Sequence, residues 1–109
     1  MSGDKTVLES IKELKGWLVI LNGPHKGKDF RLFSGKNTVG SSRMSDIFLQ
    51  GSPLDYLHFS IRFDNSDVWL TDLDSEPGVF LEGTRIWKEK IGDEMIFSAS
   101  DTNFLLKLA

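Results

Sequence analysis

The stretch that most constrains the fold is LHFSIRF, residues 57–63. Apolar and polar side chains alternate along it almost without a break. This period of two places one set on one face of a β-strand and the other set on the opposite face. The apolar set is Leu57, Phe59, Ile61 and Phe63, and the polar set is His58, Ser60 and Arg62. The pattern predicts a strand with one face in a hydrophobic core.

Similar short runs recur along the chain, and turn residues separate them. Five of the runs rich in β-forming residues are WLVIL, KDFRLF, VWLTDL, VFLEGTRIW and NFLLKL. The stretches typical of turns include NGPHKG, DNSD and DSEPG. Roughly ten such strands, with a turn signal about every eight to twelve residues and no internal helical pattern, predict an all-β antiparallel sandwich or barrel. Phe59, Phe63 and Trp69 are expected in its core, and Trp87, near a loop, is expected to be exposed.

The first fifteen residues differ from the rest of the chain. Val7, Leu8, Ile11 and Leu14 recur there at helical spacing among charged side chains, which indicates a flexible tail or a short helix. A chain of 109 residues can build one hydrophobic core but is too short for two ordinary domains. We predict a polar N-terminal tail over residues 1–15 and one β-sandwich domain over residues 16–109.

Charge and composition narrow the classes of function. A formal net charge of -3 supplies no positive field to attract nucleic acid or an anionic membrane, so we expect neither as a partner. The chain has no cysteine, which excludes disulfides and thiolate metal sites and suits a reducing compartment. No apolar run reaches the length of a signal peptide or a membrane span. We expect a cytoplasmic location.

The sequence offers little for catalysis or metal binding. The two histidines, His25 and His58, lie far apart, and neither has a second ligand at metal-binding spacing. Acidic residues cluster in DNSD and DLDSEPG, but neither stretch has the alternating ligands of a calcium loop, so we expect solvated turns. We predict that this chain is not an enzyme and holds no metal or cofactor, although a catalytic domain fused outside it is compatible with the sequence.

Four blocks of the sequence, in order, resemble the motifs of forkhead-associated (FHA) domains. The blocks are NTVGSSRMSDIFL, LHFSI, WLTDLDSEPGVFLEGTRI and GDEMIF, and the resemblance covers residues 17–108. FHA domains are antiparallel β-sandwiches that typically recognise phosphothreonine peptides through loops at one end. The resemblance implies a sandwich of about eleven short strands and a binding edge formed by loops.

The framework of the FHA pattern is kept, and its ligand-contacting positions are changed. The matching positions are Gly40, Ser45, Asp46, Ile47, His58, Asp72, Leu73, Ser75, Gly78, Phe80 and Gly83. Ser41 stands where the family has a phosphate-holding arginine, and Asp55 and Tyr56 replace its Ser-Arg pair. In the third block Pro77, Val79 and Glu82 replace Asn, Thr and Asn. By the resemblance, Gly40, His58 and Gly78 have structural roles.

These departures weaken a phosphate site. A phosphothreonine carries about -1.5 to -2 charges and is held above all by arginine. Ser41 supplies no charge, the carboxylate of Asp55 repels phosphate, and Pro77 has no backbone N–H to donate. The resemblance therefore implies a non-catalytic, phosphate-independent interaction module that serves as a regulatory or scaffolding domain of a larger bacterial-type signalling or secretion protein.

The expected binding edge comprises the loops at residues 40–46, 50–57, 75–78 and 82–87. Its expected partner-contacting residues are Ser41, Ser42, Arg43, Asp55, Tyr56, Glu76 and Pro77. The carboxylates of Asp55, Glu76 and Glu82 make this edge acidic and favour a neutral or basic protein surface as partner.

The alternative is a true phosphothreonine receptor. In that hypothesis Arg43 replaces the lost arginine, and Ser41 and Ser42 supply hydroxyl donors. Otherwise Arg43 is a solvated loop residue, paired with Asp46 or Asp55. In both hypotheses the partner is a protein or peptide. The candidates include the chain's own N-terminal tail, with Thr6 as a candidate phosphorylation site, and a sister subunit.

Overall fold

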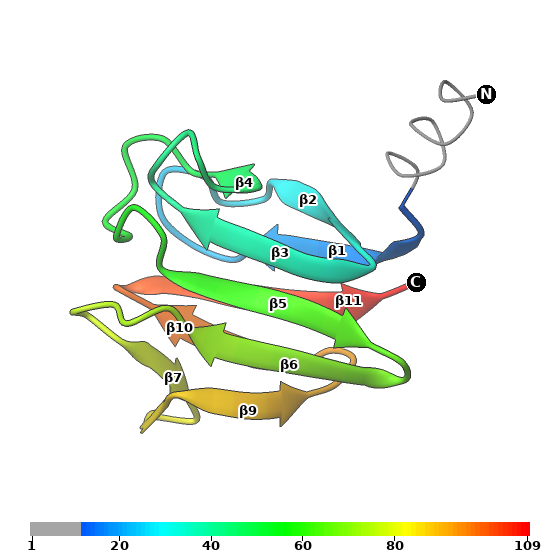
Figure 1. Ribbon diagram of the computed structural model, residues 1–109. Coiled ribbons are helices and arrows are strands. Elements are labelled where there is room, and N and C mark those ends of the chain that lie inside the picture. The colour runs from blue at the N-terminus through cyan, green and yellow to red at the C-terminus, as the bar shows by residue number, and fades with distance from the viewer. Residues whose placement is uncertain (1–11) are drawn as a thin grey trace.

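The computed structural model describes residues 12–109, which form eleven strands in two packed sheets and contain no helix (Figure 1). The strands are β1 (Leu14–Ile20), β2 (Asp29–Phe33), β3 (Gly35–Gly40), β4 (Ile47–Phe48), β5 (Phe59–Asp64), β6 (Asp67–Asp72), β7 (Val79–Leu81), β8 (Thr84–Ile86), β9 (Lys88–Ile91), β10 (Ile96–Ala99) and β11 (Thr102–Leu108). The predicted all-β sandwich of about eleven short strands is confirmed. The predicted tail as far as residue 11 lies outside the described residues.

The two sheets interleave strands from distant parts of the chain. One sheet has six strands in the order β2-β1-β11-β10-β7-β8, and the other has five in the order β4-β3-β5-β6-β9. The pairings are antiparallel except that of β3 with the two-residue β4, which is parallel. Leu14, which the sequence grouped with the helical spacing of the tail, is instead the first residue of β1 and pairs with Phe33.

The core lies between the sheets, and β5 crosses its centre. Phe59, Ile61 and Phe63 point into it, as the alternation predicted, while Leu57 precedes the strand and is 43% exposed. The ring of Phe59 meets those of Phe97 and Phe104 edge to face, with centroids 5.3 and 5.2 Å apart. Such aromatic contacts add to area burial and fix the position of the strand that leads out of the β4–β5 loop.

Two sequence-based expectations about burial are wrong. Trp69 is not a core residue, because its neighbours Val68 and Leu70 take the inward positions of β6 and its own ring faces outward, half-buried. Asp72 is not in a solvated turn, because it ends β6 with 8% of its surface exposed and its Oδ1 accepts a hydrogen bond from the Ser75 backbone N–H at 2.9 Å.

The loops that carry the FHA-like motifs gather at one end of the sandwich. Figure 1 shows the β3–β4, β4–β5 and β6–β7 connections at this end, opposite the C-terminus. The β10–β11 connection joins them, since the Ser100 hydroxyl donates to the Pro53 carbonyl at 2.8 Å. Among residues 12–109 there is no candidate membrane-spanning helix.

Candidate functional site

The β3–β4 and β4–β5 loops form one hydrogen-bonded unit. The backbone N–H groups of Ser41 and Ser42 donate to the carbonyls of Asp55 and Tyr56 at 3.0 and 3.2 Å, and the buried Ser45 hydroxyl donates to Tyr56 at 2.9 Å. Gly40 permits this close approach, because a Cβ there would clash with the Tyr56 carbonyl oxygen. The contact explains why glycine is needed where β3 ends.

His58 joins this unit to the β6–β7 loop. Its side chain is fully buried; Nδ1 accepts the Asp55 backbone N–H at 3.1 Å, and Nε2 lies 2.9 Å from the Gly78 carbonyl oxygen. Because Nδ1 accepts, Nε2 is the nitrogen that carries the hydrogen and donates to Gly78. Both ring nitrogens are therefore bonded to loop backbone, and the ring has no exposed surface through which to contact a substrate.

Asp55 stabilises the same junction from the other side. Its Oδ2 accepts the Glu76 backbone N–H at 2.9 Å, which ties the β4–β5 loop to the β6–β7 loop. The Ser41 hydroxyl is also engaged, since it donates to the Leu54 carbonyl at 2.8 Å. Ser41 and Asp55, which stand at two family phosphate positions, thus bind the protein's own backbone.

Arg43 and Met44 project from the tip of the β3–β4 loop. Both are exposed, Met44 to 84%. The expected pairing of Arg43 with Asp46 or Asp55 is wrong, because no ion pair within residues 12–109 includes Arg43. Asp46 instead accepts from the Thr38 backbone N–H at 2.8 Å and the Thr38 hydroxyl at 3.1 Å.

Arg85, which the sequence motifs did not indicate as a site residue, organises the β6–β7 loop from β8. Its Nη2 donates to the Ser75 carbonyl at 3.0 Å and lies 3.8 Å from Asp72 Oδ2, and its guanidinium stacks 4.5 Å from the centre of the Trp87 ring. The loop closes on itself where the Ser75 hydroxyl accepts the Gly78 N–H at 3.0 Å. Trp87 is 59% exposed, as expected.

The structure brings most of the predicted edge together but excludes Glu82. Ser41, Ser42, Asp55, Tyr56 and Glu76 are linked by the hydrogen bonds described above. Glu82 lies with Gly83 in the turn between β7 and β8, where both have positive φ (49° and 80°), at the end of the hairpin away from Gly78. It therefore adds no charge to the edge. The tail residue Thr6 lies outside the described residues.

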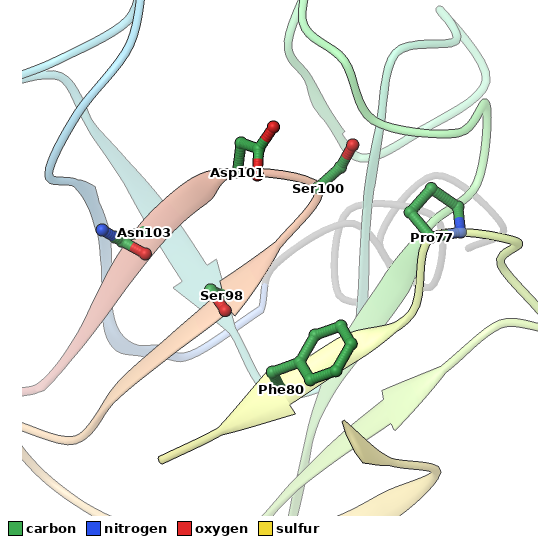
Figure 2. A pocket seen from close by; sticks show the side chains of 6 residues that line it. All are labelled: Pro77, Phe80, Ser98, Ser100, Asp101 and Asn103. Carbon is green, nitrogen blue, oxygen red and sulfur yellow. The ribbon is translucent and has the colours of Figure 1, made fainter. Parts of the chain in front are cut away.

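A shallow hollow adjoins the edge on the six-stranded sheet. Its volume is about 530 Å³, and it is lined by Pro77, Phe80, Ser98, Ser100, Asp101 and Asn103. Figure 2 shows Pro77 and Ser100 at its loop end and Phe80 and Ser98 on the strands below. Pro77 thus belongs both to the edge and to this hollow. Among residues 12–109, no group of three or more His, Cys, Asp or Glu side chains is placed to hold a metal ion.

Comparisons with known proteins support the FHA resemblance. The FHA domain of the CT664 protein from Chlamydia trachomatis is 30% identical, with a TM-score of 0.78, and the match covers 85% of this chain and 96% of that one. An FHA domain of an Arabidopsis thaliana hypothetical protein is 21% identical, with a TM-score of 0.79 and 92% coverage of both chains. A structure from a study of phosphothreonine-dependent FHA domain interactions is 19% identical, with a TM-score of 0.77 and coverage of 87% and 97%. No curated protein matches the chain.

A family model covers most of the domain. It is described as the inner membrane component of T3SS, cytoplasmic domain, and it matches residues 19–107. That span runs from within β1 to within β11 and so includes all the loops of the edge. The chain is an FHA domain and belongs to the family of cytoplasmic domains of the T3SS inner membrane component.

Proposed function

We propose that this domain binds its protein partner without requiring phosphate, through an edge made by residues 40–46, 50–57 and 75–78. FHA domains are protein-interaction modules. The finer proposal is that this one serves, without catalysis, as a regulatory or scaffolding domain on the cytoplasmic side of a T3SS inner membrane component. The observation that carries it is the hydrogen bond between the Asp55 carboxylate and the Glu76 N–H, at 2.9 Å.

Asp55 stands where the family pattern has a serine, and its carboxylate accepts the Glu76 N–H. A phosphate approaching it would meet like charge and would compete for an N–H that is already bonded, while charge-assisted bonds from cations are what normally hold phosphate. The exposed Glu76 side chain adds a second carboxylate beside the first. Met44 and Tyr56, 84% and 78% exposed, offer apolar contact area at the same edge. A neutral or basic protein surface fits this combination better than phosphate does.

One observation favours the alternative, a phosphothreonine receptor. Arg43 is exposed and in no ion pair within the described residues, so its guanidinium is free to contact a ligand. The Ser42 hydroxyl accepts the Met44 N–H at 3.0 Å and keeps its own hydrogen to donate. Ser41 is less suitable, because its hydroxyl already donates to Leu54. In this alternative, one candidate ligand is an N-terminal tail phosphorylated on Thr6, from the same chain or from a sister subunit.

Peptide titrations test which function holds. Phosphothreonine peptides and their plain counterparts, including one that spans residues 1–11, are titrated into the domain and into Arg43→Ala. We expect no binding that depends on phosphate. Phosphate-dependent binding that weakens with salt and is lost in Arg43→Ala would overturn the proposal and establish the alternative.

A pull-down from the native host tests whether this edge is the surface that binds the partner. Asp55→Arg reverses the charge and removes the acceptor for Glu76, whereas Asp55→Asn removes the charge and keeps an acceptor oxygen. We expect the partner to be lost with Asp55→Arg and weakened with Asp55→Asn. Retention by both variants, with unchanged melting temperatures, would move the binding surface away from this edge.

A further inference from the structure

The outer face of the five-stranded sheet carries a row of cations around a tryptophan. Strand pairing sets Lys36 opposite Arg62, Arg62 opposite Trp69, and Trp69 opposite Lys90. Residues directly opposite one another share a face of the sheet, and β3, β5, β6 and β9 lie side by side in Figure 1. Lys88 is two residues before Lys90 and on the same face. We call these five residues, Lys36, Arg62, Trp69, Lys88 and Lys90, the basic face.

Trp69 is the centre of the basic face. The Nζ atoms of Lys88 and Lys90 lie 5.0 and 5.6 Å from the centre of its ring, which is the range of cation–π contact. Two ammonium groups are thereby held beside an outward aromatic ring. A carboxylate side chain placed on this ring would find hydrogen-bond donors for its oxygens and an apolar surface for its methylene groups.

Most of the positive charge on the basic face is not neutralised by the protein itself. Within residues 12–109 only Lys90 of the four cations forms an ion pair, with Asp67 at 3.6 Å. Lys36 and Arg62 are like charges directly opposed across β3 and β5, an arrangement that destabilises a sheet. The fold gains nothing from that opposition, whereas a bound anion would relieve it.

The negative charge around the basic face favours a short acidic protein segment over a nucleic acid or a membrane as the bound anion. The whole chain carries -3, and Asp64 and Asp67 face each other at the turn end of the same sheet. A nucleic acid or an anionic membrane would extend over these acidic surroundings and be repelled, because its charge is continuous. A short acidic stretch of protein can place its carboxylates on the cations alone. The row spans three inter-strand spacings, about 14 Å, which matches a helix of about ten residues.

We propose that the basic face docks an acidic segment of a partner protein. This surface is separate from the loop edge, so a domain that uses both contacts two protein segments at once. The inference does not depend on the proposed function, since neither Asp55 nor Arg43 contributes to the basic face. The docking is electrostatic with an aromatic anchor, so it weakens with added salt and also depends on Trp69.

The test uses a synthetic peptide of about twelve residues with glutamates on one helical face, and a matched peptide with glutamine in their place. Binding is measured by calorimetry, and the site is mapped by amide NMR shifts. We expect only the glutamate peptide to bind, with shifts in β3, β5, β6 and β9. Binding should be about tenfold weaker in Arg62→Glu/Lys88→Glu, and several-fold weaker in Trp69→Ala.

Two further variants serve as controls for net charge and for loss of stability. Lys26→Glu/Lys28→Glu changes the net charge equally on the exposed β1–β2 loop and should leave affinity within about twofold. Lys36→Gln/Lys88→Gln removes two charges without adding any and replaces the reversal variant if that one melts early. Equal losses in the loop control, shifts confined to residues 40–57, or no effect of Trp69→Ala would overturn the inference. So would binding of poly-uridine RNA or phosphatidylglycerol vesicles to this face without binding of the glutamate peptide.

Discussion

Replacing His58 by alanine tests the junction on which the whole loop edge depends. The substitution leaves two backbone groups without partners, the part-buried Asp55 N–H and the buried Gly78 carbonyl. Each orphaned group costs about 1–3 kcal/mol, and water entering the space left by the ring offsets part of this. We expect a net loss of about 3 kcal/mol in the free energy of unfolding, which for a domain of this size lowers the melting temperature by roughly 12–24 °C.

Two partial replacements of His58 separate the contributions of its two hydrogen bonds. The side-chain oxygen of His58→Asn occupies a position near Nδ1 and can still accept the Asp55 N–H, whereas His58→Gln can place its amide near Nε2 and donate to Gly78. Each should lose about half as much as His58→Ala. Urea unfolding measures the loss as a shift in midpoint at constant slope. A loss below about 1 kcal/mol in His58→Ala, or no difference among the three variants, would refute the bridging role.

Two further substitutions probe the loops on either side of His58. Gly40→Ala forces a Cβ against the Tyr56 carbonyl and should cost about 1–3 kcal/mol by thermal melting. Gly92→Ala, whose Cβ would meet only the Met95 sulfur at 4.0 Å, is the matched control and should stay within about 0.5 kcal/mol. Arg85→Ala leaves Asp72 Oδ2 buried without its cation; because Arg85 is 38% exposed, we expect about 1–2 kcal/mol rather than the roughly 3–5 kcal/mol of a fully buried pair. A loss no larger than that of the exposed Arg31→Ala would show that the Arg85 contact is not stabilising.

The fold could be predicted from the sequence because its signals are local. The alternation in LHFSIRF fixes which side chains of β5 are buried, and glycine, proline and asparagine mark the turns. The expectation that Trp69 lies in the core is wrong, because the alternation of its strand puts Val68 and Leu70 at the inward positions and Trp69 on the outer face. The period gives the two faces of a strand, and the more strongly apolar set takes the core.

The candidate site could be predicted only as a set of loops. The positions of Ser41 and Asp55 followed from the FHA pattern, but their hydrogen bonds to Leu54 and Glu76 depend on loop shapes that no local pattern encodes. No local pattern indicates Arg85 for the same reason, since its contact with Ser75 crosses ten residues and joins two different elements. Turn chemistry likewise could not show that Glu82 would end up away from the edge.

The boundary strands of the two sheets have a consequence for assembly. The five-stranded sheet ends in β4, with only two residues, and in β9, which carries Lys88, Glu89 and Lys90. The six-stranded sheet ends in the three-residue β8 on one side and in β2, which carries Asp29 and Arg31, on the other. A strand from another chain needs a long, uncharged border to extend a sheet. Copies of this domain crowded together would therefore resist fusing into continuous sheets, and would stay separate folded units even at high local concentration.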